Sequence, residues 1–167
     1  EANLVEYLFS PAQLNQAVAS KADKIARRVI EKLSFVGLLA VEMFVTKSEE
    51  VLVNEIAPRP HNSGHQTIEG NVTSQYEQHL RAILNLAPGD TSILCPSAMV
   101  NLLGEEGFSG LARYDGLEAV LKVEGIHVHL YGKKFTKPFR KMGHVTVVDQ
   151  DLESLKKKAN FVKQTLK

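Results

Sequence analysis

Two β-rich runs joined by a short polar stretch constrain the fold of this chain more than any other feature of its sequence. Leu38 to Thr46 and Val51 to Ile56 are rich in strand-forming residues, and Lys47 to Glu50 lie between them. Branched and aromatic side chains favour strands, and a short polar connection is typical of an antiparallel hairpin. The sequence therefore predicts a β-hairpin in the first half of the chain.

Two glutamates on this hairpin form the first candidate site. With residues 47–50 as the turn, the cross-strand pairs are Thr46 with Val51, Phe44 with Val53 and Glu42 with Glu55. Directly opposed residues share a sheet face, with β-carbons about 5 Å apart, and like charges placed there repel each other unless something neutralises them. A divalent cation such as Mg²⁺ would do so. A register shifted by one residue would instead turn one glutamate to solvent.

The loop after the second run concentrates polar side chains. Glu55 to His65 contains an arginine, two histidines, an amide and a hydroxyl. The prolines beside Arg59 stiffen its backbone, and a guanidinium there is suited to bind a phosphate or a carboxylate. His61 and His65 have the spacing of a helical zinc pair, but the prolines and Gly64 disfavour a helix and no cysteine is nearby, which argues against zinc. The loop is either a binding loop or a structural turn.

A basic run near the C-terminus forms the second candidate site. Gly132 to His144 reads GKKFTKPFRKMGH, with five lysines and arginines and no acidic residue. Glycines at both ends allow close approach of the backbone, and Pro138 restrains the loop between them. The run is either a solvated basic surface or an anion-binding loop. His127 and His129 lie just before it on one face of a predicted strand, where alternation alone accounts for their spacing.

The rest of the sequence predicts an α+β fold. Apolar residues at helical spacing predict helices over residues 11–33 with Ser10 as N-cap, from Ser74 and Glu77 as a capping box to Pro88, and from Asp151 onward with Leu152, Leu155, Ala159, Val162 and Leu166 on one side. Further strands are expected at the start of the chain and at residues 98–103, 126–131 and 145–148, and residues 57–71 are expected to be an irregular loop. The predicted domains are residues 1–88, an incomplete larger unit, and residues 89–167, a small β-rich domain.

Composition excludes several classes of protein. A net charge of +1 gives no overall field to attract nucleic acid or a membrane. No apolar run is long enough to span a bilayer. Cys95 is the single cysteine, which excludes an internal disulfide framework and favours the cytoplasm. The chain opens on Glu1 and runs directly into a strand-like segment, which suggests a piece of a longer protein.

At this point the sequence resembles a known family. VEMFVT at residues 41–46, VLVNEIAPRPHNSGHQTIE at residues 51–69 and the YGK…RKMGH element at residues 131–144 are similar to segments of N5-carboxyaminoimidazole ribonucleotide synthetases, which are ATP-grasp enzymes. The resemblance extends over nearly the whole chain. It implies the C-terminal half of an ATP-grasp domain over residues 1–88, followed by the family's small C-terminal domain.

The resemblance also implies roles for individual residues. Glu42 and Glu55 would bind the Mg²⁺ that holds the ATP phosphates. Arg59, His61 and Asn62 would line the catalytic site, and Lys133 and Arg140 would bind the 5′-phosphate of aminoimidazole ribonucleotide. Other ATP-grasp ligases often have an asparagine ligand two residues after the second glutamate, where this chain has Ala57.

The implied reaction is the carboxylation of aminoimidazole ribonucleotide in purine biosynthesis. It uses ATP and bicarbonate, passes through carboxyphosphate and gives the N5-carboxylated ribonucleotide, and the enzyme is expected to be a homodimer. No Gly-rich loop or adenine-binding segment is present in this sequence, so we expect the isolated polypeptide to bind ATP poorly and to be inactive. The alternatives are another ATP-grasp ligase, such as the formate-dependent glycinamide ribonucleotide transformylase, or a non-catalytic dimerisation fragment.

Overall fold

The computed structural model describes residues 5–167, and these form two compact units. The hairpin unit comprises residues 12–68 and 72–92. The sheet unit comprises the described residues up to Pro11, residues 69–71 and residues 93–167. Both contain helices and strands, so the predicted α+β class is confirmed.

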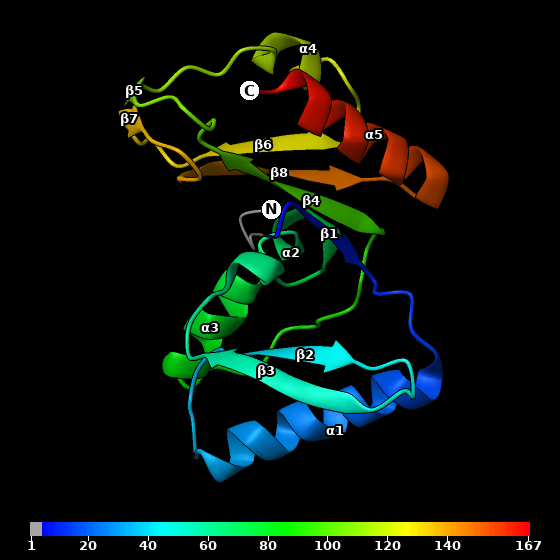
Figure 1. Cartoon of the computed structure of the whole chain (residues 1–167). Helices are drawn as coiled ribbons and strands as arrows, with labels where there is room; N and C mark the ends of the chain where they lie inside the picture. The colour runs from blue at the N-terminus through cyan, green and yellow to red at the C-terminus, as the bar shows by residue number, and fades with distance from the viewer. Residues whose placement is uncertain (1–4) are drawn as a thin grey trace. The chain divides into compact units, whose positions relative to one another are not determined.

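The hairpin unit is a helix packed on a two-stranded sheet. Helix α1 (Gln16–Lys32) lies along the hairpin of β2 (Ala40–Val45) and β3 (Val51–Ala57), as Figure 1 shows. The apolar stripe of α1 faces β3 across a groove lined by Ile25, Val29, Leu33 and Ile56. The chain then passes through the 3₁₀ turn η1 (Asn62–Gly64), α2 (Thr67–Gly70) and α3 (Gln75–Ile83). The segment expected to be an irregular loop therefore contains two short helical turns.

Two predicted helix starts had different outcomes. The capping residue at Ser74 is confirmed, because its side chain accepts a hydrogen bond from the Glu77 backbone N–H at 3.2 Å. The start at Ser10 is wrong. Ser10 is the last residue of β1 (Tyr7–Ser10) and pairs with Ser97, so its backbone belongs to a sheet. Helix α1 begins at Gln16, where the Asn15 side chain accepts from the Val18 N–H at 2.9 Å.

The hairpin register contains a β-bulge. Glu42 pairs with Glu55, as the sequence predicts. The predicted pairs Thr46 with Val51 and Phe44 with Val53 are wrong. The observed pairs on the turn side are Val45 with Val51, Phe44 with Leu52 and Met43 with Val53. The ladder shifts between Glu42 and Met43, and Asn54 is the extra residue that absorbs the shift.

The sheet unit is built on a four-stranded antiparallel sheet. Its strand order is β1–β4–β8–β6, and the remaining strands have the bounds Ser97–Leu103 (β4), Ile126–Leu130 (β6) and Lys141–Val148 (β8). Helices α4 (Leu117–Leu121) and α5 (Leu152–Thr165) pack on one face of this sheet (Figure 1). Two short strands, β5 (Gly110–Leu111) and β7 (Phe135–Thr136), pair at its side.

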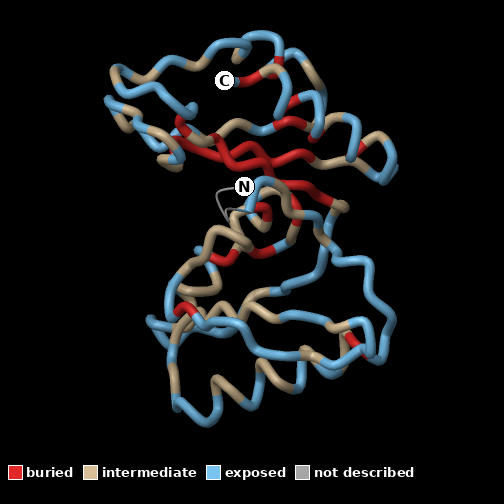
Figure 2. Tube along the Cα trace, viewed as in Figure 1, coloured by how far each residue is buried: buried red, intermediate tan, exposed pale blue. Residues whose placement is uncertain are grey.

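The main core of the described residues lies between this sheet and α5. Figure 2 shows the buried residues concentrated along β4, β8 and one side of α5. Alternate strand residues meet the helix, and the cluster includes Ala98, Val100, Leu102, Val145, Val147, Leu155, Ala159, Val162 and Leu166. Leu152, predicted on the same helix face, is 40% exposed because it lies in the first turn, beyond the edge of this cluster.

The opposite face of the sheet holds a polar cluster. His129 Nε2 lies 2.7 Å from Glu69 Oε1, and the His129 ring stacks on His144 with centroids 4.5 Å apart. Tyr131 OH in turn lies 3.0 Å from His144 Nδ1. The structural role predicted for His129 agrees with these contacts. Within the part of the chain that the structure describes, no helix has the length and apolarity needed to cross a bilayer.

The compact units differ from the predicted domains at the start of the chain. β1 pairs with β4, so Tyr7–Ser10 lies in the sheet unit rather than with the residues that follow it. The change from one unit to the other falls between Ser92 and Ile93, close to the predicted boundary at Pro88. The strand expected at the very start also covered residues 1–4, which lie outside the described residues.

Asp149 joins the end of β8 to the first turn of α5. Its carboxylate accepts hydrogen bonds from Ser154 Oγ at 2.6 Å and from the Asp151 N–H at 2.9 Å, and it forms an ion pair with Lys158 Nζ at 2.8 Å. The Lys158 ammonium, aided by these two donors, holds the pKa of Asp149 well below its usual range.

The stabilisation from Asp149 is expected to disappear in acid. Because its pKa is lower in the folded chain, this contribution is complete above the unfolded-state pKa of about 3.9 and is lost as the pH falls toward the folded-state pKa. At neutral pH, Asp149→Asn should lower the free energy of unfolding by roughly 1 kcal/mol, allowing for partial solvent exposure. Urea denaturation of both proteins across the acid range measures this. A difference between them that does not shrink as the pH falls contradicts the assignment.

Candidate functional site

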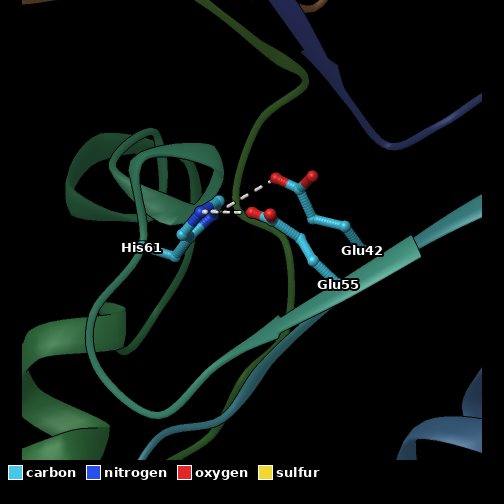
Figure 3. A group of neighbouring side chains, drawn as sticks. All are labelled: Glu42, Glu55 and His61. Carbon is cyan, nitrogen blue, oxygen red and sulfur yellow. Dashed lines mark ion pairs between the residues drawn. The ribbon is translucent and has the colours of Figure 1, made fainter. Parts of the chain in front are cut away.

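Glu42, Glu55 and His61 form a three-residue cluster in the hairpin unit. The two glutamates project from the same face of the hairpin toward the His61 ring (Figure 3). His61 Nδ1 lies 3.6 Å from Glu42 Oε1, and His61 Nε2 lies 3.9 Å from Glu55 Oε1. One ligand atom from each residue falls within 4.8 Å of the other two. The predicted pairing of the glutamates on one face is thus confirmed, and His61 comes from the following loop to join them.

The two carboxylates reach solvent to different extents. The Glu55 side chain is 59% exposed and that of Glu42 is 34% exposed, whereas that of His61 is 13% exposed. Glu55 is therefore the more solvated of the two carboxylates, and Glu42 is half-buried.

His61 is held from both its ring and its backbone. Its Nδ1 lies 2.8 Å from Ser63 Oγ, and its side chain caps the turn η1 by accepting from the Ser63 N–H. Its backbone N–H and carbonyl are both bonded to the Gln75 amide. The ring therefore has a fixed direction toward the glutamates.

The donor set fits a divalent cation. Two carboxylates opposed on one sheet face repel each other, and a cation between them removes that cost. Hard cations such as Mg²⁺ take carboxylate oxygens, usually from one or two side chains together with waters and phosphates. Glu42 and Glu55 could hold such an ion, and His61 is close enough to pair with either carboxylate.

Arg59 and Asn62 lie in the same loop as His61, on either side of it in the sequence. Arg59 is exposed, and its Nη1 donates to the carbonyl of Pro60 at 3.1 Å. Among residues 5–167, no ion pair joins Arg59 to either glutamate. Asn62 opens η1, and its carbonyl accepts from the His65 N–H at 3.2 Å.

Lys133 and Arg140 lie in the sheet unit, on the loop between β6 and β8. Lys133 Nζ donates to the carbonyl of Lys141 and sits 5.6 Å from the centre of the Tyr131 ring. Arg140 Nη1 donates to the carbonyl of Phe135 at 2.9 Å. Lys133 thus bonds to the first residue of β8 and Arg140 to the first residue of β7, and their meeting at a single anion site stays a prediction.

Two family models match the chain. The ATP-grasp domain model matches residues 1–76, and the phosphoribosylaminoimidazole carboxylase C-terminal domain model matches residues 97–158. The N5-carboxyaminoimidazole ribonucleotide synthase of Bacillus subtilis is 45% identical over 148 residues, covering 89% of this chain and 37% of that protein. The chain belongs to the N5-carboxyaminoimidazole ribonucleotide synthase family.

Solved structures agree with this family and its fold. The N5-carboxyaminoimidazole ribonucleotide synthetase of Thermotoga maritima is 55% identical with a TM-score of 0.94, over 96% of this chain and 45% of that one. The synthase of Aspergillus clavatus, solved with ADP and 5-aminoimidazole ribonucleotide, is 32% identical with a TM-score of 0.88, over 98% of this chain and 44% of that one. This chain spans less than half the length of these relatives.

Sequence reasoning missed Gln75 as a part of the site. Gln75 follows the N-cap Ser74 and reads as an ordinary first-turn residue of a helix. Its three contacts with the loop residues His61 and His65 join positions ten and fourteen apart in the chain. No local pattern reports such contacts, because they depend on how the loop folds back onto α3.

Proposed function

We propose that this chain supplies the metal-binding carboxylates and the ribonucleotide anchor of an ATP-grasp ligase in purine biosynthesis. The proposed reaction carboxylates 5-aminoimidazole ribonucleotide with bicarbonate and ATP, and it gives ADP, phosphate and N5-carboxyaminoimidazole ribonucleotide. The observation that carries the proposal is the cluster of Glu42, Glu55 and His61, formed by the segment with the family's characteristic sequence. The Aspergillus relative solved with ADP and aminoimidazole ribonucleotide supports the choice of substrates.

The chemistry has two steps with one shared intermediate. A bicarbonate oxygen attacks the terminal phosphorus of ATP, and ADP leaves, which gives carboxyphosphate. The amine of the ribonucleotide then attacks the carboxyl carbon, phosphate leaves, and the amine loses a proton. Phosphoryl transfer of this kind depends mainly on positioning and on stabilisation of negative charge.

Each residue of the hairpin unit has a proposed role in this chemistry. Glu42 and Glu55 would hold Mg²⁺, which when bound neutralises charge on the ATP phosphates. His61 and Asn62 would contact the reacting groups from the loop. Arg59 is exposed, so its side chain can turn toward the developing negative charge without a change in the backbone.

The sheet unit has a different proposed role. Lys133 and Arg140 would bind the 5′-phosphate of the ribonucleotide, Lys133 as a point charge and Arg140 through a bidentate contact. Both cations lie on the connection between β6 and β8, within the basic run at residues 132–144, which supports this role.

The proposal is tested by the substrate requirement of a full-length enzyme that carries this sequence. ADP release is measured with ATP, bicarbonate and aminoimidazole ribonucleotide, and again with each one omitted. Turnover should require all three. ADP release that instead depends on formate and glycinamide ribonucleotide identifies the rival ligase, and no ADP release with either set contradicts an enzymatic role.

Loss of the Arg140 guanidinium is expected to weaken binding of the ribonucleotide. Arg140→Ala removes charge-assisted hydrogen bonds, each contributing about 1.5–3 kcal/mol, so KM for the ribonucleotide should rise by at least about tenfold while KM for ATP stays nearly unchanged. Steady-state kinetics with each substrate varied in turn measures both constants. Lys134→Ala is the matched control, because Lys134 is an exposed cation of the same loop. A rise in KM for ATP alone would indicate that the basic run at residues 132–144 is a solvated surface and not an anion-binding loop.

Three broader features belong to the same proposal. Residues 1–88 would be part of the ATP-grasp domain and residues 89–167 the small C-terminal domain, which the matches at residues 1–76 and 97–158 support. A homodimeric state rests on the family resemblance alone, and a cytoplasmic location rests on that resemblance and on the single cysteine, Cys95.

A further inference from the structure

Gln75 fastens the loop that carries His61 to the first turn of α3. Its amide oxygen accepts from the His61 backbone N–H at 2.9 Å, and its amide nitrogen donates to the His61 carbonyl at 2.8 Å. The same nitrogen lies 2.8 Å from His65 Nδ1. Gln75 is only 7% exposed, and all three residues lie in the hairpin unit. One side chain thus pairs with both backbone polar groups of His61, as a neighbouring strand would.

The chemistry of these partners fixes the orientation of the amide. A backbone N–H only donates and a carbonyl only accepts, so the oxygen and nitrogen of the Gln75 amide cannot exchange places. The second N–H must then be accepted by His65 Nδ1. Tyr76 OH also lies 2.7 Å from His65 Nδ1, and the His65 and Tyr76 rings stack with centroids 5.7 Å apart. His65 is thus held between Gln75 and Tyr76.

The backbone around Gln75 is equally restricted. A β-carbon at position 64 would lie 2.6 Å from the Gln75 amide oxygen, so Gly64 leaves the space that the amide occupies. The Gln75 N–H donates to Thr67 Oγ1 at 2.9 Å, and Thr67 Oγ1 donates to the Gly64 carbonyl at 2.6 Å. The loop is thus tied to α3 at His61, His65 and Gly64 through one residue.

This arrangement sets where the His61 ring can be. With both backbone polar groups of His61 fixed, only its side-chain torsions remain, and Ser63 Oγ restrains the ring at Nδ1. The ring then faces Glu42 and Glu55 at 3.6 and 3.9 Å. A shift of the loop would therefore change both of these distances.

We propose that Gln75 is a positioning residue of this site, acting through His61 and not through contact with a substrate. The two hydrogen bonds between the Gln75 amide and the His61 backbone, here called the amide clamp, hold the loop so that His61 and Asn62 have the position relative to Glu42 and Glu55 that the reaction requires. This inference rests on the proposed function. According to this proposal, the rate of the chemical step depends on a buried side chain that lies outside residues 51–69, the loop segment with the family's sequence.

The chain offers a close control on the same helix. Gln78 makes the same kind of amide pairing with the backbone of Gly89, donating to its carbonyl at 2.6 Å and accepting from its N–H at 3.0 Å. Gln78 contacts no residue of the cluster among the described hydrogen bonds. Gln75→Glu and Gln78→Glu therefore remove equivalent donors from α3, one at the site and one away from it.

The test compares these two variants in the full-length enzyme. Gln75→Glu sets a carboxylate oxygen against the His61 carbonyl, so kcat should fall about 10- to 100-fold, as expected for a displaced reacting group, with both KM values within about threefold. Gln78→Glu should keep kcat within about twofold while losing comparable stability in a urea melt. Equal losses of kcat in the two variants, or no loss in either, overturn the proposal. Turnover of the unsubstituted enzyme is measured in parallel, so failure of the proposed function is recognised separately.

A second measurement uses the chain itself and needs no activity. Long-range ¹H–¹⁵N spectra of the histidine rings report the environments of His61 and His65 separately. Gln75→Glu should shift the His61 and His65 signals, and Gln78→Glu should leave both unchanged. Gln75→Met, which keeps the length without adding charge, replaces Gln75→Glu if that variant does not fold. If the His61 and His65 signals do not shift in the folded Gln75 variant, the proposal that Gln75 positions His61 is contradicted.

Discussion

Glu55→Gln in a full-length enzyme that carries this sequence is expected to lower kcat by about a thousandfold or more, because metal stabilisation of phosphoryl transfer contributes several kcal/mol. The substitution keeps the volume of the side chain and removes the charge that would hold Mg²⁺. The Glu55 side chain is 59% exposed, faces another carboxylate and lies 3.9 Å from His61 Nε2, so its neutralisation is expected to leave the fold intact.

The measurement is turnover at saturating Mg²⁺, with a thermal melt to show that the fold is kept. Glu50→Gln is the matched control, because Glu50 is an exposed glutamate at the turn of the same hairpin. It should leave turnover within about twofold, as surface substitutions usually do. If Glu55→Gln retains more than a small fraction of the activity, Glu55 does not hold the metal.

Leu155→Ala is expected to destabilise the sheet unit by about 2–5 kcal/mol, the usual cost of emptying a buried leucine site. Leu155 is 1% exposed and packs in the cluster between α5, β4 and β8. Urea denaturation followed by circular dichroism measures the change in the free energy of unfolding.

Leu152→Ala is the control for this substitution. It lies on the same helix and involves the same chemical change, but Leu152 is 40% exposed. It should cost no more than about 1 kcal/mol, since little apolar area is buried there. Equal effects of the two substitutions would show that α5 does not pack through Leu155.

The glutamate pair was predictable because it depends on local information. A polar turn between two β-rich runs sets the register closely enough to oppose Glu42 and Glu55. The error on the turn side arose because the ladder has a bulge at Asn54, which strict alternation does not include. Phe44 is therefore paired with Leu52 and not with Val53.

The remaining differences come from contacts distant in sequence. Ser10 and Pro11 have the composition of a helix start, but Ser10 pairs with Ser97, and a ladder overrides local capping preference. His61 could be named as a site residue from its loop, but its position over the glutamates depends on Gln75, fourteen residues later. Local patterns thus predicted that the two glutamates oppose each other, and tertiary contacts determined how His61 lies beside them.

The close approach of Gly64 to the Gln75 amide links the residue types that positions 64 and 75 can hold. A β-carbon at position 64 would lie only 2.6 Å from the amide oxygen of Gln75, which is too close for both to fit without a shift. A side chain at position 64 would therefore displace the Gln75 amide from the His61 backbone unless position 75 changed as well. A chimera that joins the loop of one relative to α3 of another should accordingly keep the position of His61 only when its residues at positions 64 and 75 fit each other.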